Sequence, residues 1–163
     1  MYYYKCPKKL GYLEISLDTE GKIQSAIFID SLNQKKLSPK KYSPELTEII
    51  KNELDAYFLK KKNISSSIIS KEIKGTDFQK SIWAIICKVP YGATITYTEM
   101  TKRAGNMSAA RAAGTACGKN PVALFIPCHR VVRKEGEDYG YSWGPERKKW
   151  LLEFESDALN SAL

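Results

Sequence analysis

The chain of 163 residues is poor in the residues that metal sites, disulfide frameworks and membrane segments require. It has one histidine and four cysteines, none in C-x-x-C spacing, so neither a standard structural zinc site nor an added metal-binding module can be identified. No apolar run approaches the roughly 20 residues that cross a bilayer, and the N-terminus lacks the apolar segment of a signal peptide. These absences predict a soluble protein of the cytoplasm, or of the nucleus in a eukaryote, with free thiols and no cofactor or metal.

What the chain does contain is enough apolar surface for an ordinary core, with 43% hydrophobic and 11% aromatic residues. The length suits one domain or two small ones, and the sequence changes character at Gly75. We therefore expect an α+β protein in which residues 1–74 form a small α/β scaffold domain and residues 75–163 a mainly helical domain. The formal charge of +8 suggests an anionic partner.

The first 74 residues show no chemistry. Apolar positions in residues 11–17 and 22–29 predict two strands joined by a turn. Residues 31–42 are polar and predict a loop, and Ser43-Pro44-Glu45 is a typical helix start. A further short strand is predicted over residues 67–73.

Three helix starts follow in the second half. Thr76 with Gln79, and Thr96 with Glu99, have the spacing of capping boxes, and Ser108 is placed to cap a third helix that runs from Ala109 to Cys117. The second and third helices, with a glycine turn between them, predict a helix-turn-helix, although an ordinary helical hairpin fits the same pattern.

The third helix is built of small residues. Ala110 and Gly114 leave Arg111 as the long side chain among them. Such a surface allows the helix backbone to approach another surface closely. Tight packing between helices, with Arg111 as an ordinary surface charge, is the alternative.

The only histidine lies directly beside a cysteine, in Pro127-Cys128-His129-Arg130-Val131-Val132. An ordinary thiol has a pKa of about 8.5 and is a weak nucleophile at neutral pH until a nearby imidazole removes its proton. In a strand the two side chains would point to opposite faces, so either the chain turns here or a water relays the proton. The alternative is a buried, inert cysteine beside a histidine of the core.

Basic residues surround this pair in the sequence. Between Tyr97 and Lys134 there are seven lysines and arginines, Arg130 and Arg133 among them, and one acid, Glu99. Such a field favours both a thiolate and binding of a phosphate backbone. Charge alone does not establish DNA binding.

The hexapeptide resembles the active-site signature of O6-alkylguanine-DNA alkyltransferases, also called methylated-DNA–protein-cysteine methyltransferases. Asn120-Pro121 upstream and Gly140-Tyr141-Ser142-Trp143-Gly144 downstream match in order and spacing. The likeness runs from Gly75 to Glu155; residues 1–74 resemble the family only in position and general pattern. The resemblance implies DNA repair by a monomer that takes one alkyl group from O6-alkylguanine in double-stranded DNA after flipping the base through the minor groove. It leaves O4-alkylthymine open as a second substrate.

The resemblance also implies roles for single residues. Cys128 accepts the alkyl group, His129 draws its proton through a water, and Glu155 orients His129. Asn120 braces the turn at the active site, and Tyr97 donates a hydrogen bond to guanine N3. Without the resemblance, Tyr97 would be interpreted as an aromatic side chain packed into the core. The implied DNA-binding residues are Tyr97, Ser108, Ala110, Arg111 and Gly114, and the implied pocket residues are Val131, Tyr141, Ser142 and Trp143.

Trp143 stands where many family members have glycine. A bulky ring there predicts weaker reaction with benzyl than with methyl adducts. Three other functions remain alternatives. A damage-sensing protein would bind the lesion without chemistry, but the known proteins of that kind lack the acceptor cysteine. A cysteine hydrolase would need an oxyanion hole, which cannot be located in the sequence, and a helix-turn-helix regulator would need a helix less rich in alanine to read the major groove.

Overall fold

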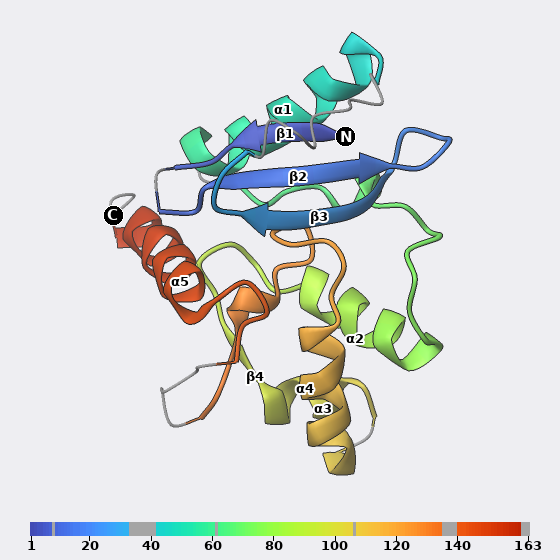
Figure 1. Ribbon diagram of the computed structural model, residues 1–163. Helices are drawn as coiled ribbons and strands as arrows, with labels where there is room; N and C mark the ends of the chain where they lie inside the picture. Colours follow the sequence, from blue (N-terminus) through green and yellow to red (C-terminus); the bar gives the residue numbers. More distant parts are fainter. Residues whose placement is uncertain (8, 33–41, 61, 106, 135–139, 161–163) are drawn as a thin grey trace. The chain divides into compact units, whose positions relative to one another are not determined.

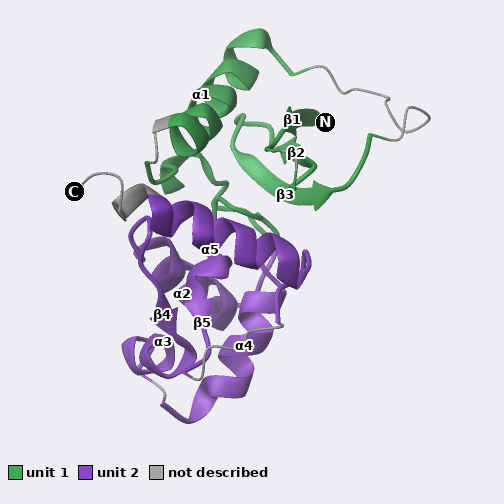
Figure 2. Ribbon diagram, turned by 90° about the vertical axis from the view of Figure 1, so that its left-hand side faces the viewer, with its two compact units in different colours: residues 1–73, 121–125 green, residues 74–120, 126–163 purple. Residues whose placement is uncertain are grey.

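The computed structural model describes residues 1–7, 9–32, 42–60, 62–105, 107–134 and 140–160 (Figure 1). They form a three-stranded antiparallel sheet, a two-stranded parallel sheet and five α-helices, which confirms the predicted α+β class. The chain divides into two compact units (Figure 2): residues 1–73 with 121–125, and residues 74–120 with 126–163. The assignment of two domains stays a prediction. The structure adds that residues 121–125 group with the first unit.

The sheet of the first unit has the order β1-β2-β3, with β1 over Tyr2–Lys5, β2 over Tyr12–Leu17 and β3 over Ile23–Ile29. β2 alternates between buried and half-buried residues, as a strand with one core face requires. Residues 121–125 join β3: Ala26 N–H donates to the Pro121 carbonyl (3.0 Å), and Ala123 N–H donates to the Ala26 carbonyl (2.8 Å).

The prediction for this unit was incomplete in two places. β1 was missed because its tyrosines do not alternate with polar residues, as the strand pattern requires. The structure shows that the Tyr4 hydroxyl donates a hydrogen bond to Asp55 (2.7 Å). The strand predicted over residues 67–73 was wrong. A 3-10 turn at Ser66–Ile68, capped by the Ser65 hydroxyl, occupies its start, and only a single bridge, Ile69 to Ile23, remains.

Helix α1, Pro44–Lys60, begins at the predicted position, with the Ser43 hydroxyl accepting from Leu46 N–H (3.4 Å). Its apolar side is buried through Ile50, Leu54 and Tyr57. The loop predicted over residues 31–42 lies largely outside the described residues.

The second unit begins with α2, Asp77–Cys87, whose capping box is confirmed: the Thr76 hydroxyl accepts from Gln79 N–H, and the Gln79 side chain accepts from Thr76 N–H. Trp83 packs into the core of this unit and donates its indole N–H to the Ala116 carbonyl (2.9 Å). This bond ties α2 to α4.

Helices α3, Tyr97–Arg103, and α4, Ala110–Gly118, form the predicted pair. The Thr96 hydroxyl caps α3 by accepting from Glu99 N–H (3.1 Å), and Gly105 in the turn has φ +73°, which glycine adopts without strain. The cap predicted at Ser108 was wrong. Ser108 lies inside a 3-10 turn, Met107–Ala109, and α4 begins after Ala109 without a side-chain cap.

Two short strands close the second unit beside these helices. β4, Ile95–Thr96, runs parallel to β5, Val131–Val132, with Ile95 opposite Val131 and Thr96 opposite Val132. Helix α5, Pro145–Asn160, follows and packs against the turn that precedes β5. That turn carries the cysteine–histidine pair.

Candidate active site

The chain turns at the pair, as one of the two predicted alternatives requires. Cys128–Arg130 is a 3-10 turn in which Cys128 N–H donates to the Ile126 carbonyl (2.8 Å) and Arg130 N–H to the Pro127 carbonyl (2.9 Å). The three side chains of the turn, Cys128, His129 and Arg130, are 5%, 0% and 3% exposed. Three consecutive polar or reactive side chains are therefore buried, and each needs a partner.

Asn120 is the partner of Cys128. Its side-chain amide donates to the Ile126 carbonyl (2.8 Å) and to Cys128 Sγ (3.1 Å). One amide therefore holds both the backbone before the turn and the sulfur. Asn120 is buried and lies two residues after the end of α4, so the helix end fixes the position of the thiol.

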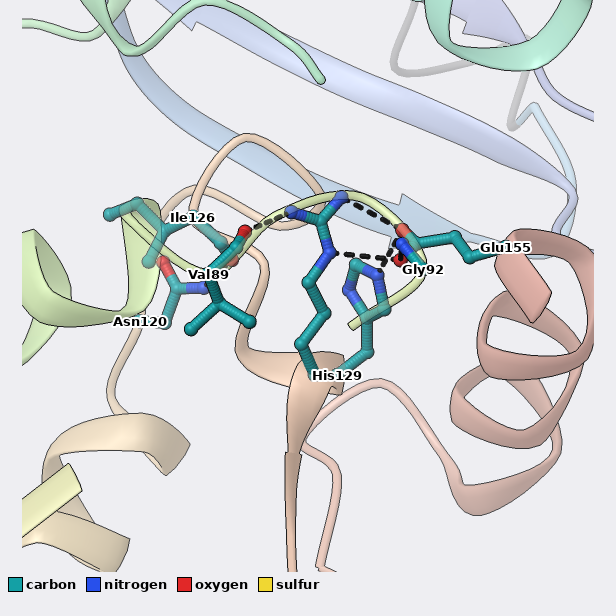
Figure 3. Close-up of polar contacts among 7 residues, drawn as sticks. Val89, Gly92, Asn120, Ile126, His129 and Glu155 are labelled. Atoms are coloured by element: carbon teal, nitrogen blue, oxygen red, sulfur yellow. Dashed lines mark hydrogen bonds and ion pairs between the residues drawn. The ribbon is translucent and has the colours of Figure 1, made fainter. Parts of the chain in front are cut away.

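Glu155 is the partner of His129. Its Oε1 lies 2.8 Å from His129 Nε2, and its Oε2 accepts from Gly92 N–H (3.0 Å), as Figure 3 shows. Glu155 is 1% exposed, whereas Glu153 on the same helix faces solvent. The structure thus brings together Cys128, Asn120, His129 and Glu155.

Arg130 is the residue that the sequence reasoning misplaced. Its Nε donates to Glu155 Oε2 (2.9 Å), its Nη2 to Glu155 Oε1 (3.0 Å) and its Nη1 to the Val89 carbonyl (2.6 Å). Its guanidinium also lies 5.8 Å from the centre of the Tyr91 ring. Arg130 therefore balances a buried carboxylate and does not belong to the basic field offered to phosphates.

These partners determine how His129 is protonated. Burial raises the pKa of Glu155, but His129 and Arg130 outweigh it and bring that pKa down to about 2. Burial lowers the pKa of His129, so the ring is neutral at pH 7. An ionised carboxylate only accepts hydrogen bonds, so Nε2 carries the hydrogen and Nδ1 keeps the lone pair. Among the described residues, the buried Nδ1 has no hydrogen-bond partner.

The thiol of Cys128 is neutral at rest. Burial raises its pKa to about 11, although Asn120 and Lys148 act in the opposite direction. A nearby cation thus favours the thiolate, as expected of positive charge, but loss of solvation outweighs it. The thiol needs a base at the moment of reaction.

Lys148 is a second buried residue that the sequence reasoning missed. It is 2% exposed, and its Nζ donates to the Val131 carbonyl (2.6 Å). The signal was present in the sequence. Lys148, Leu151 and Glu155 are spaced by three and four residues and so lie on one face of α5.

The segment after β5 includes three of the predicted pocket residues. Tyr141 is buried, and its ring meets that of Trp143 edge to face at 5.3 Å between centroids. Burial raises the pKa of Tyr141 well above its ordinary value, so its hydroxyl is neutral. The Ser142 hydroxyl donates to the Gly118 carbonyl (2.7 Å), so a role at guanine O6 stays a prediction for it.

The predicted DNA-binding residues lie mostly around one open cavity of about 460 Å³. Tyr97, Ala110, Arg111 and Gly114 line it, and Ser108 is not among the lining residues. The cavity is also lined by residues that the sequence reasoning had not assigned individually: Thr98, Arg133, Lys134 and Gly140. The described part of the chain contains no cluster of histidine, cysteine or carboxylate groups that could hold a metal ion. No helix within it is long and apolar enough to cross a membrane.

A buried thiol held by an asparagine, with a histidine–carboxylate pair beside it and a helix-turn-helix in the same unit, is the arrangement expected of a cysteine-based DNA alkyltransferase. Comparison with known proteins agrees. The family model described as 6-O-methylguanine DNA methyltransferase, DNA binding domain, matches residues 77–157.

Relatives match over nearly the whole chain. A probable methylated-DNA–protein-cysteine methyltransferase of Acanthamoeba polyphaga mimivirus is 43% identical over 150 residues, 90% of this chain and 91% of the relative. The Methanosarcina mazei methylated-DNA–protein-cysteine methyltransferase is 34% identical over 161 residues, 98% of this chain and 99% of the relative. The crystal structure of Mycobacterium tuberculosis OGT in complex with DNA has a TM-score of 0.73 at 29% identity, covering 95% of this chain and 92% of that one. The chain belongs to the family of methylated-DNA–protein-cysteine methyltransferases.

Proposed function

We propose that this protein repairs DNA by moving the alkyl group of O6-alkylguanine to Cys128 Sγ, one group per protein molecule. The observation that carries the proposal is the bond from Asn120 to Cys128 Sγ (3.1 Å), beside a neutral His129 held by Glu155 (2.8 Å). This arrangement supplies a positioned nucleophile, a base and a group that orients the base.

The proton leaves first or together with the attack. The Cys128 proton passes through one bridging water to His129 Nδ1, and Glu155 stabilises the imidazolium that forms. Sγ then bonds to the alkyl carbon as the bond from that carbon to guanine O6 breaks. The electron pair stays with guanine, which takes up, through water, the proton that the His129 imidazolium gives back, while Tyr97 donates a hydrogen bond to N3 and offsets the developing charge.

The reaction ends after one turnover. The product at Cys128 is a thioether, which is a poor leaving group, and nothing in the proposed steps removes it. Repair therefore consumes the protein, and the count of alkyl groups removed equals the count of active molecules.

The target base has to leave the stack before it reaches a buried sulfur. The side of α4 that lines the cavity carries Ala110 and Gly114, small enough for the helix to lie close to a minor groove, and Arg111 is long enough to occupy the space that the base leaves. The proposed partner is double-stranded DNA with O6-alkylguanine, bound by a monomer.

The test is intact and peptide mass spectrometry after incubation with an O6-methylguanine duplex. The expected result is a gain of one methylene on the Cys128 peptide that stops at one equivalent and is absent from Cys128→Ser. The same experiment on an O4-methylthymine duplex decides the second substrate. Binding without mass gain contradicts the proposal and indicates a damage sensor; repeated turnover on an ester indicates a hydrolase.

A further inference from the structure

The open cavity of the second unit is lined by two basic side chains that the proposed function does not use. Arg133 and Lys134 are exposed and line the cavity together with Tyr97, Thr98 and Arg111. Arg111 projects from α4, whereas Arg133 and Lys134 follow β5. The cavity therefore has positive charge on two separate segments of the chain.

The pairing of β4 with β5 explains this position. The two strands are parallel, with Thr96 opposite Val132, so the segments that follow β4 and β5 leave the sheet at the same end. Tyr97 and Thr98 leave from β4, and Arg133 and Lys134 leave from β5. The residues that open α3 are thus held next to the two cations, which follow Cys128 by five and six residues.

Among the residues that the structure describes, the lining of the cavity contains three cations and no carboxylate. Within the described ranges, the side chains of Arg133 and Lys134 make no ion pair or hydrogen bond, whereas Arg103 pairs with Glu99 (3.1 Å) and Arg130 with Glu155 (2.9 Å). Exposed cations concentrated around an open cavity attract an anion.

We infer that Arg133 and Lys134 bind the backbone phosphates of the strand that carries the target nucleotide, while Arg111 acts on the side of α4. The inference rests on the proposed function and adds two residues that position DNA. A nucleotide that leaves the duplex remains joined to a phosphate on each side, and we place those two phosphates at the cavity that the predicted DNA-binding residues Tyr97 and Arg111 also line. A guanidinium grips a phosphate through two donors and an ammonium acts as a point charge, so the pair provides both kinds of contact.

The experiment separates phosphate binding from chemistry by using two substrates. The double variant Arg133→Gln/Lys134→Gln is compared with the full wild-type chain for alkylation of Cys128 by an O6-methylguanine duplex and by free O6-benzylguanine base, which has no phosphate. The matched control is Lys80→Gln/Lys149→Gln, which removes two exposed charges from α2 and α5.

We expect the duplex rate of the double variant to fall at least tenfold at physiological salt, with the rate on the free base unchanged. In duplex binding, the slope of log affinity against log salt becomes shallower by about 2, since each lost phosphate contact removes about 0.9. The control changes both quantities much less. Equal losses on the two substrates, an unchanged salt slope, or an equal effect of the control overturns the inference. The salt slope measures binding alone, so it tests the phosphate contacts even if the wild type transfers no alkyl group and the proposed function fails.

Discussion

Two arginines three residues apart, Arg130 and Arg133, lie in opposite environments within the same unit. Arg130 is buried, with all three kinds of guanidinium nitrogen bonded to Glu155 or the Val89 carbonyl. Arg133 is exposed at an open cavity. The buried network holds one geometry, because each of its charges needs its partner. The open cavity has charge to offer a ligand.

The comparison shows what a count of charges misses. Counted in sequence, both arginines belong to one basic field around Cys128. In the structure, Arg130 neutralises Glu155 and keeps it ionised, while Arg111, Arg133 and Lys134 line the open cavity. The buried network and the proposed attraction of DNA thus use different cations.

The largest expected effect comes from removing each arginine in turn. Arg130→Met leaves Glu155 charged and under-partnered in the interior, which costs about 3–5 kcal/mol of unfolding free energy. Arg133→Met is expected to change it by less than about 0.5 kcal/mol, as exposed substitutions do. Urea unfolding measures both. Adding Glu155→Gln to Arg130→Met should recover part of the loss; equal effects of the two single substitutions would remove the distinction between the regions.

Acid should weaken the buried network and leave the open cavity unaffected. The pKa of Glu155 is about 2 in the folded chain and about 4.3 when unfolded. Its contribution, about 3 kcal/mol, is therefore present above pH 5 and lost as the pH falls toward 2. Burial also lowers the pKa of His129, so the unfolded chain takes up a proton below about pH 6.5 that the folded chain does not. Stability should thus begin to fall near that pH.

Urea unfolding at several pH values checks this profile. Glu155→Gln should flatten the part below pH 5, and Arg133→Met should leave the whole profile unchanged. A wild-type stability that stays constant between pH 7 and pH 3 would show that neither group is coupled to folding.

Removing the proposed base, His129, is expected to have a somewhat smaller effect than removing Arg130, and the effect on the alkylation rate should decrease as the pH rises. Because burial raises the pKa of Cys128 to about 11, His129→Gln should slow alkylation by free O6-benzylguanine about 100-fold at pH 7.5. Hydroxide replaces the base at higher pH, so the deficit should shrink toward pH 9.5. The urea midpoint of the variant controls for folding. A deficit that is independent of pH would assign His129 a structural role only.

Much of this site could be predicted from the sequence, and the missing parts have a common cause. Cys128 and His129 are adjacent, so a local motif was enough to propose them, and the caps at Thr76 and Thr96 follow from local spacing. Asn120, eight residues before Cys128, was proposed through the family resemblance. Glu155 was chosen over Glu153 only through the family resemblance. Nothing in the local sequence tells a buried glutamate on α5 from an exposed one.

The partners of Arg130 and Lys148 depend on contacts between distant segments. Arg130 meets Glu155 and Val89, 25 and 41 residues away in the chain. No spacing rule predicts such pairs. Only Lys148 left a local signal, as a lysine on the buried face of α5. Ser108 failed for the opposite reason: its residue type suits a cap, but a 3-10 turn shifts the helix start past it.

The smallest expected effect concerns the size of the alkyl group, at the edge between the two regions. The Trp143 ring is half-buried and lies edge to face against the buried Tyr141. Because both are predicted pocket residues, we expect the ring to narrow the approach to the sulfur more for a benzyl group than for a methyl group. The series Trp143→Phe, Trp143→Ala and Trp143→Gly should raise the ratio of benzyl to methyl second-order rates stepwise, by about tenfold in total, since a misfit of this size is worth about 1–3 kcal/mol. Rates on O6-benzylguanine and O6-methylguanine duplexes give the ratio directly, and the phosphates that Arg133 and Lys134 are proposed to bind are the same in both. A ratio unchanged across the series would place the ring outside the path of the alkyl group, where it serves only to pack against Tyr141.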